Sequence, residues 1–146
     1  MTVRIQTEDF DIAAELAALS AGRDDIGALV TFTGLVRGGD IAAMTLEHYP
    51  GMTERALQKI EAEANARWPL KASLIIHRIG RLEPGAQIVL VATASESRHA
   101  AFEAATFLMD YLKTDAPFWK NEERGDGTSQ WVDAREADKN SKARWD

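Results

Sequence analysis

The chain has 146 residues, 45% of them hydrophobic and 27% charged, which suits one globular domain with its own apolar core. Seventeen Lys and Arg against 23 Asp and Glu give a net charge of −6, which argues against a general nucleic-acid-binding protein. Cysteine is absent, which excludes disulfides, zinc–thiolate sites, iron–sulfur clusters and a cysteine nucleophile.

Residues 3–6 are predicted to form a short strand. Thr7 or Asp9 then caps a helix, because apolar residues recur at helical spacing over residues 10–19 until Gly22 interrupts the pattern. The first nine residues lack the apolar run of a signal peptide, and no apolar stretch reaches the roughly 18 residues of a membrane helix. We therefore expect a cytoplasmic protein.

The next segment is predicted to form a strand pair followed by a helix. Residues 27–36 are β-branched and apolar, as in a buried strand, and residues 42–49 form the returning strand after a tight turn at 38–40. A helix follows from about residue 52 to residue 67, with apolar residues along one side, and Pro69 ends it.

Two further strands are expected at residues 71–79 and 87–94, separated by a turn at 83–85. A third helix should run from about Ser97 to residue 113 or 114. After Pro117 the chain becomes polar, with one short strand around residues 130–134. This order mixes hairpins with crossovers and favours an α+β fold with a mixed or antiparallel sheet over a doubly wound parallel one.

We expect one α+β domain over residues 1–136 and a loose, charged tail over 137–146. The sequence lacks a glycine-rich phosphate loop, a Gly-x-Ser-x-Gly elbow and a His-Glu-x-x-His pair, so we expect no metal and no cofactor. His48 and His77 lie in apolar strands, where a histidine is more often a hydrogen-bonded structural residue than a ligand.

The candidate functional residues are cations beside turns and helix ends. Arg37 ends an apolar strand, Arg98 and His99 begin the third helix, Lys113 ends it, and Lys120 follows a Pro-Phe-Trp segment. A single surface Lys or Arg is usually only a solvated charge. A helix N-terminus that bears Arg98 and His99, however, can bind an anion through its unpaired N–H groups and its dipole.

The charge state of Lys113 stays open at this stage. A helix C-terminus stabilises its ammonium form, whereas a second cation such as Lys120 nearby would lower its pKa. Arg98 and Lys113 lie about 15 residues apart on one helix, or about 22 Å at about 1.5 Å per residue. Either the two belong to one pocket shared by two subunits of a symmetric dimer, or one of them is not functional.

Several long strings of unusual composition point to a known family. They are residues 31–37, residues 45–54 with Leu46-Glu47-His48-Tyr49-Pro50-Gly51-Met52, residues 76–80 and 109–114, Ala116-Pro117-Phe118-Trp119-Lys120, and residues 131–135. At these strings, and along nearly its whole length, the chain resembles the large, catalytic subunit of molybdopterin synthase, the MoaE family. The resemblance implies an α/β-hammerhead-like fold with three main helices and a small C-terminal β extension.

The resemblance also implies a sulfurtransferase of molybdenum cofactor biosynthesis. In this family a homodimer of large subunits binds a small ubiquitin-like carrier at each end, giving a heterotetramer. The carrier's C-terminal Gly-Gly thiocarboxylate delivers sulfur to cyclic pyranopterin monophosphate and forms the dithiolene of molybdopterin. A chain without cysteine has no thiol to give, and a cationic pocket suits two anionic substrates.

Carried over by position, Lys113 and Lys120 match the active-site lysines of the family. The resemblance implies that Lys113 lies closest to the thiocarboxylate carbonyl and that Lys120 stabilises charge on the substrate phosphate or the intermediate. Further positions match substrate-binding residues: Arg37 with the backbone at Leu35 and Val36, Asn121 and Glu122, Arg98 from the neighbouring subunit, and Arg135.

The sequence departs from the family at three places. Ser97 stands where the family usually has histidine, and His99 follows two residues later, beyond Arg98, so it is an alternative pocket residue. Asp115 stands where the family often has arginine, and the loop at residues 38–40 is shorter than usual. A non-catalytic module that binds the carrier tail, or an unrelated phosphate-ester enzyme that needs no carrier, are the alternative functions.

Overall fold

The computed structural model describes residues 1–132 and 136–146, and within them the chain forms eight strands and four helices. The strands are β1 (Thr2–Gln6), β2 (Ala28–Leu35), β3 (Ile41–His48), β4 (Leu70–Arg78), β5 (Gly80–Leu82), β6 (Gln87–Ser95), β7 (Phe118–Arg124) and β8 (Ser129–Val132). The helices are α1 (Ile12–Ser20), α2 (Met52–Arg67), α3 (Arg98–Thr114) and α4 (Glu136–Ala143). The expected α+β class is confirmed.

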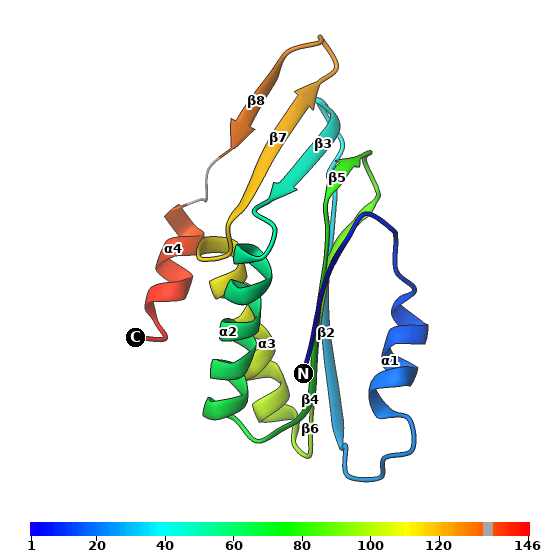
Figure 1. Cartoon of the computed structure of the whole chain (residues 1–146), viewed down its shortest axis with the longest axis vertical. Coiled ribbons are helices and arrows are strands. Elements are labelled where there is room, and N and C mark those ends of the chain that lie inside the picture. Colours follow the sequence, from blue (N-terminus) through cyan, green and yellow to red (C-terminus); the bar gives the residue numbers. More distant parts are fainter. Residues whose placement is uncertain (133–135) are drawn as a thin grey trace.

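The strands form two four-stranded sheets. The central sheet has the order β1-β4-β6-β2, with β1 parallel to β4 and the other pairs antiparallel, so it is mixed. The second sheet has the order β5-β3-β7-β8 and is antiparallel throughout. Helices α2 and α3 lie on one face of the central sheet and α1 lies on the other, while the second sheet extends beyond one end of it (Figure 1).

The central strands are apolar on both faces because helices cover both faces. On β4 and β6, Ile75 and Val91 belong to the core cluster beneath α2 and α3, whereas Leu74 and Leu90 pack beneath α1. Each of these side chains is at most 2% exposed. In the part of the chain that the structure describes, no helix combines the length and the apolar character needed to cross a membrane.

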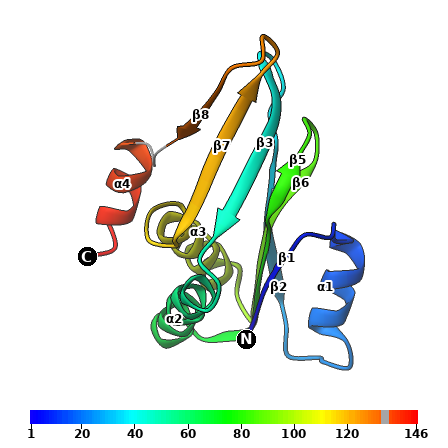
Figure 2. The ribbon, with the colours of Figure 1, turned by 45° about the horizontal axis from the view of Figure 1, so that its top comes forward.

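The second sheet meets the central sheet through a small apolar cluster. Met44 and Leu46 of β3 pack with Leu82 of β5 against Val36, which follows β2. Figure 2 shows β3 and β7 running side by side from this junction toward the tip of the second sheet. Because strand residues alternate between faces, the side of β3 that bears Leu46 is the side turned toward the central sheet.

The predicted hairpin over residues 27–49 is wrong. Both strands exist, but β2 pairs with β6 at the edge of the central sheet, and β3 pairs with β5 and β7 in the second sheet. The bend after residue 37 therefore carries the chain from one sheet to the other. The turn chemistry of Gly38 and Gly39 is compatible with both outcomes, and the burial of Met44 and Leu46 against Val36 decides between them.

Three smaller expectations also differ from the structure. Asp11 caps α1, and its side chain accepts a hydrogen bond from the N–H of Ala14, so neither Thr7 nor Asp9 is the cap. The strands β5 and β7 were not expected. The C-terminal segment, predicted as a loose tail, contains helix α4.

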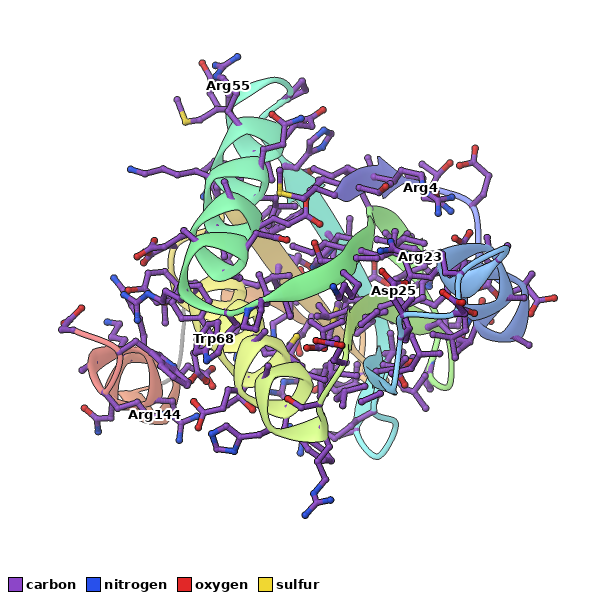
Figure 3. The ribbon with its side chains drawn as sticks, turned by 90° about the horizontal axis from the view of Figure 1, so that it is seen from below. Arg4, Arg23, Asp25, Arg55, Trp68 and Arg144 are labelled. Atoms are coloured by element: carbon purple, nitrogen blue, oxygen red, sulfur yellow. The ribbon has the colours of Figure 1, made fainter. Side chains whose placement is uncertain are left out.

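Helix α4 lies beside α3, and the residues that follow α4 hold the two helices together. The Trp145 ring meets Trp68 and Phe107 edge-on, with centroids 5.5 and 5.6 Å apart, and its Nε1–H donates a 2.6 Å hydrogen bond to Asp110. Figure 3, seen from below, shows Trp68 on the side of the helix pair that faces α4, with Arg144 beside α4. Buried aromatic area and a satisfied indole N–H fix this C-terminal segment.

Candidate active site

One candidate lysine lies at the end of α3 and the other on the second sheet. Lys113 lies exposed in the last turn of α3, and half-buried Lys120 lies on β7 directly opposite Leu46 of β3. Paired residues of antiparallel strands point to the same face, so Lys120 is on the side turned toward the central sheet. Phe118 shares this face two residues away, or about 7 Å along the strand.

Buried His77 contacts Phe118 and lies close to Lys113. Its ring stacks on Phe118, with centroids 3.8 Å apart and planes 17° apart, and it lies near enough to Lys113 to feel its charge. Burial lowers the pKa of His77 to about 4, and repulsion by Lys113 and His48 contributes in the same direction. The imidazole is therefore neutral at physiological pH, and the lysines supply the positive charge of this corner.

The segment between the two lysines is anchored at three points by three different elements. The Thr53 hydroxyl of α2 donates a 3.0 Å hydrogen bond to the Pro117 carbonyl. The ring of Phe118 lies on His77 of β4. Asp115 forms a 2.9 Å ion pair with Lys142 of α4. Each lysine therefore extends from backbone that is held in place, as a preorganised cationic site requires.

The carboxylate of Asp115, a residue that departs from the family pattern, is paired with a cationic side chain of α4. Lys142 pairs with it, and this hydrogen bond raises the pKa of Lys142. Lys142 also lies 5.3 Å from the centroid of the Tyr111 ring. The carboxylate next to Lys113 is thus matched by a partner on α4.

Arg37 lies at the same end of the central sheet as the lysines. It follows Val36, whose 3% exposed side chain packs in the cluster with Leu46, the strand partner of Lys120. The Val36 N–H donates to the Ala86 carbonyl and the Val36 carbonyl accepts from Gly85, so both of its backbone groups are engaged. Leu35 and Val36 were predicted to bind substrate through their backbone. Of the two, Leu35 has the exposed side chain, at 55%.

Asn121 and Glu122 point to opposite faces of β7. Glu122 pairs with Met44, on the face that carries Lys120, whereas Asn121 pairs with Thr45 and Trp131 on the outer face. The structure therefore brings Glu122 toward the lysines within one chain and turns Asn121 away from them.

The opposite end of α3 carries the second group of predicted residues. Ser97 occupies the N-cap position of α3, although its side chain makes no capping hydrogen bond. Ser97, Arg98 and His99 line an open groove of about 700 Å³ together with Phe102. The His99 side chain is 84% exposed and lies 3.5 Å from Glu103 one turn further on. Two acidic residues, Glu96 and Glu103, complete the rim of this groove.

One chain thus carries two separate groups of cations, one at each end of α3. This arrangement agrees with the expectation that Arg98 and Lys113 cannot meet within a single subunit. Arg135, the remaining predicted pocket residue, lies outside the described residues.

The sequence did not single out Thr53 or Phe118, and it treated His77 only as a structural histidine. His77 is indeed buried, and its Nδ1 lies 2.8 Å from the Arg78 carbonyl. The signal available for Thr53 was its place in the first turn of a helix, which does not reveal a bond to a residue 64 positions away. Long-range contacts of this kind become visible only in the fold.

Comparisons with known proteins show the family and the fold. The family model of the MoaE protein matches residues 5–115. The molybdopterin synthase catalytic subunit of Mesorhizobium japonicum is 57% identical over 147 residues, covering 99% of this chain and 92% of that protein. Among solved structures, a molybdopterin biosynthesis MoaE protein from Burkholderia ambifaria is 58% identical with a TM-score of 0.86, over 99% of this chain and 97% of that one.

A more distant structure has the same fold. The molybdopterin synthase from Staphylococcus aureus is 32% identical, with a TM-score of 0.80, over 88% of this chain and 95% of that one. A family model that spans most of the chain, and relatives above half identity along its length, show the family. The chain belongs to the MoaE protein family.

Proposed function

We propose that the chain is the catalytic subunit of a molybdopterin synthase. It transfers sulfur from the C-terminal thiocarboxylate of a small ubiquitin-like carrier to cyclic pyranopterin monophosphate, and two such transfers form the dithiolene. The observation that carries this proposal is the pair of lysines held on either side of one anchored segment, in a chain similar throughout to such catalytic subunits.

Charge explains why lysines suit this reaction. The carrier tail and the pterin phosphate are both anions, and the protein as a whole has a net charge of −6, so a local cationic site is needed to hold them together. Lys113 polarises the thiocarboxylate carbonyl or moves a proton there, and Lys120 stabilises negative charge on the phosphate or on the intermediate. Arg37 and Glu122 border the same site.

Each transfer has a simple balance. The thiocarboxylate sulfur forms a bond to a side-chain carbon of the pterin, and a carbon–oxygen bond at that carbon breaks, with the oxygen staying on the phosphate or leaving as water. The bond between the sulfur and the carrier's carbonyl carbon then breaks, and the sulfur stays on the pterin. Water supplies the oxygen that leaves the carrier with a carboxylate. The negative charge that develops on the carbonyl oxygen during this cleavage is the charge that a neighbouring ammonium stabilises.

The working assembly is a heterotetramer of two copies of this chain and two carriers. In it, Arg98 with Ser97 or His99 at the start of α3 completes the neighbouring copy's lysine site, and Arg135 contributes to the same pocket. The separation of the two ends of α3 supports this division between subunits. A cytoplasmic location belongs to the proposal, and the cysteine-free sequence is compatible with a reducing compartment.

Reconstitution with purified components tests the function. The chain is mixed with thiocarboxylated carrier and cyclic pyranopterin monophosphate, and the dithiolene product is quantified by mass spectrometry. We expect product with the wild type, a loss of about a hundredfold with Lys113→Ala, and no loss with Lys59→Ala, an exposed lysine of α2 that serves as the matched control.

The same experiment separates the alternatives. Tight carrier binding without product would identify a non-catalytic binding module. Turnover of the pterin phosphate in the absence of carrier would identify an unrelated phosphate-ester enzyme. Either result would refute the sulfurtransferase.

A further inference from the structure

We propose that His77 is a positioning residue of the lysine site: its ring holds Phe118, and through it the strand that carries Lys120, in place. The inference rests on the proposed function, because it concerns the same two lysines. It assigns to a buried histidine a role in the reaction that does not require contact with either substrate.

The first step is the stack itself. The rings of His77 and Phe118 are nearly parallel at a centroid distance of 3.8 Å, whereas the other aromatic pairs among the described residues meet edge-on or tilted. Such close face-to-face contact fixes the orientation of the Phe118 ring. Because Lys120 lies two residues further along the same face of β7, a shift of Phe118 moves Lys120 as well.

The second step is the rigidity of the platform. His77 is 5% exposed and lies on β4 in the interior of the central sheet, between Ile5 of β1 and Val89 of β6. Its Nδ1–H donates a 2.8 Å hydrogen bond to the Arg78 carbonyl, which also fixes the ring tautomer. A site residue placed on a well-paired strand holds its geometry better than one on a loop.

The third step is the charge of the ring. The titratable groups that face His77 are Lys113 from α3 and His48 from β3, while β1 and β6 present apolar residues. Both titratable neighbours disfavour a proton on His77, and burial does so more strongly. A neutral ring supports Phe118 without placing a third positive charge against Lys113.

Two variants at His77 and one control separate a positioning role from simple loss of stability. His77→Ala removes the ring, and His77→Phe keeps a flat ring without a titratable nitrogen. Leu74→Ala is the control, because Leu74 is 2% exposed on the same strand but faces α1, away from the lysines. Each variant is assayed for kcat, for KM of the carrier, for the pH profile of kcat and for Tm.

We expect His77→Ala to lower kcat about tenfold or more, with KM for the carrier within about twofold, because misplacement of a catalytic group acts on the chemical step. His77→Phe should retain at least about half of kcat. Its pH profile should match that of the wild type, because a ring that stays neutral contributes no titration step to the pH dependence of kcat. Leu74→Ala should lower Tm comparably while its kcat stays near the wild-type value.

Two outcomes would overturn the inference. If His77→Ala keeps its kcat as Leu74→Ala does, the stack does not position the lysines. If His77→Phe is as slow as His77→Ala and its pH profile is altered, the imidazole takes part in proton transfer and is not a positioning residue.

A second readout decides the question even if the wild type proves inactive, a result that would refute the proposed function instead. Acetylation of lysines by acetic anhydride is followed residue by residue with mass spectrometry. Half-buried Lys120 should become several-fold more reactive in His77→Ala, but not in His77→Phe or Leu74→Ala. Unchanged reactivity in His77→Ala would contradict the positioning role.

Discussion

The buried hydroxyl of Thr53 is hydrogen-bonded to the carbonyl of Pro117, 3.0 Å away, at the midpoint of the segment that joins the two lysines. The same oxygen accepts a 2.9 Å hydrogen bond from the N–H of Tyr49, so one side chain ties the end of β3, the start of α2 and the approach to β7 together. The geometry of the lysine site therefore depends on a residue that does not line it.

Thr53→Val should test this dependence, because valine has the same shape and lacks the hydroxyl. It leaves the Pro117 carbonyl and the Tyr49 N–H without their partner, which should cost about 1–3 kcal/mol in the free energy of unfolding, measured in urea. We also expect kcat for sulfur transfer to fall. The control is Thr106→Val on the exposed side of α3, where the change should stay within about 0.5 kcal/mol. Equal effects of the two variants would contradict the anchoring role of Thr53.

Local sequence patterns predicted an element correctly where the residues of that element alone determine its structure. The helix predicted over residues 52–67 matches α2, Met52–Arg67, because its apolar residues repeat on one side and Pro69 stops it. The continuous apolar runs of β4 and β6 were equally clear, since both faces of these strands are covered. The pairing of β2 was not predictable from its turn, because the partner strand β6 lies more than 50 residues further along the chain.

The strand β7 escaped prediction because of the candidate site residues that it carries. Its inner face carries Phe118, Lys120 and Glu122, so it lacks the alternation of apolar and polar residues that indicates a half-buried strand. Functional residues on an inward face break the usual pattern. The two lysines were already candidates from their positions at a helix end and after a Pro-Phe-Trp segment, and the family resemblance supplied their expected roles. Their neighbours Thr53 and His77 emerged only from the fold.

The low pKa of His77 predicts a specific loss of stability in acid. The unfolded chain binds a proton at this residue near pH 6.5, the folded chain only near pH 4, so acid favours the unfolded state between these values. The contribution of neutral His77 to the free energy of unfolding is fully present above pH 6.5. It falls by about 3 kcal/mol as the pH drops to about 4.

Urea unfolding of the wild type and of His77→Phe at a series of pH values measures this effect. The difference in unfolding free energy between the two proteins should change across the window, with the wild type losing more stability in acid. Parallel pH dependences would show that His77 titrates normally in the folded protein.

Trp145 should account for much of the attachment of α4. Trp145→Ala removes two edge-on ring contacts and the hydrogen bond to Asp110, and we expect it to lower the free energy of unfolding by about 2 kcal/mol. Trp145→Phe keeps an aromatic ring but lacks the N–H donor, so its free energy of unfolding should fall between those of the wild type and Trp145→Ala. Arg144→Ala, which removes a second and more exposed bond to the same carboxylate, is the control and should change little. A loss with Arg144→Ala as large as that with Trp145→Ala would contradict the assignment.

Asp115 should matter little for catalysis, because its ion pair with Lys142 is the exposed anchor of the segment and the anchors at Thr53 and Phe118 remain without it. Asp115→Ala should leave kcat within about twofold of the wild type, since exposed ion pairs contribute little and are screened by solvent. Steady-state assays at low and at physiological ionic strength check this. A gain of tenfold or more would mean that the carboxylate restrains Lys113.

The claim on which the account depends most is that two copies of this chain build each site, with Lys113 from one copy and Arg98 from the other. Subunit mixing tests it directly: Lys113→Ala and Arg98→Ala chains are expressed separately and together, with two tags for purifying the mixed dimer. If the site is shared, each variant alone is nearly inactive, and the mixed dimer regains about half of the wild-type activity, because one of its two sites carries both side chains. If Arg98 and Lys113 served the same chain, every site in the mixed dimer would lack one of them and activity would stay at the level of the separate variants.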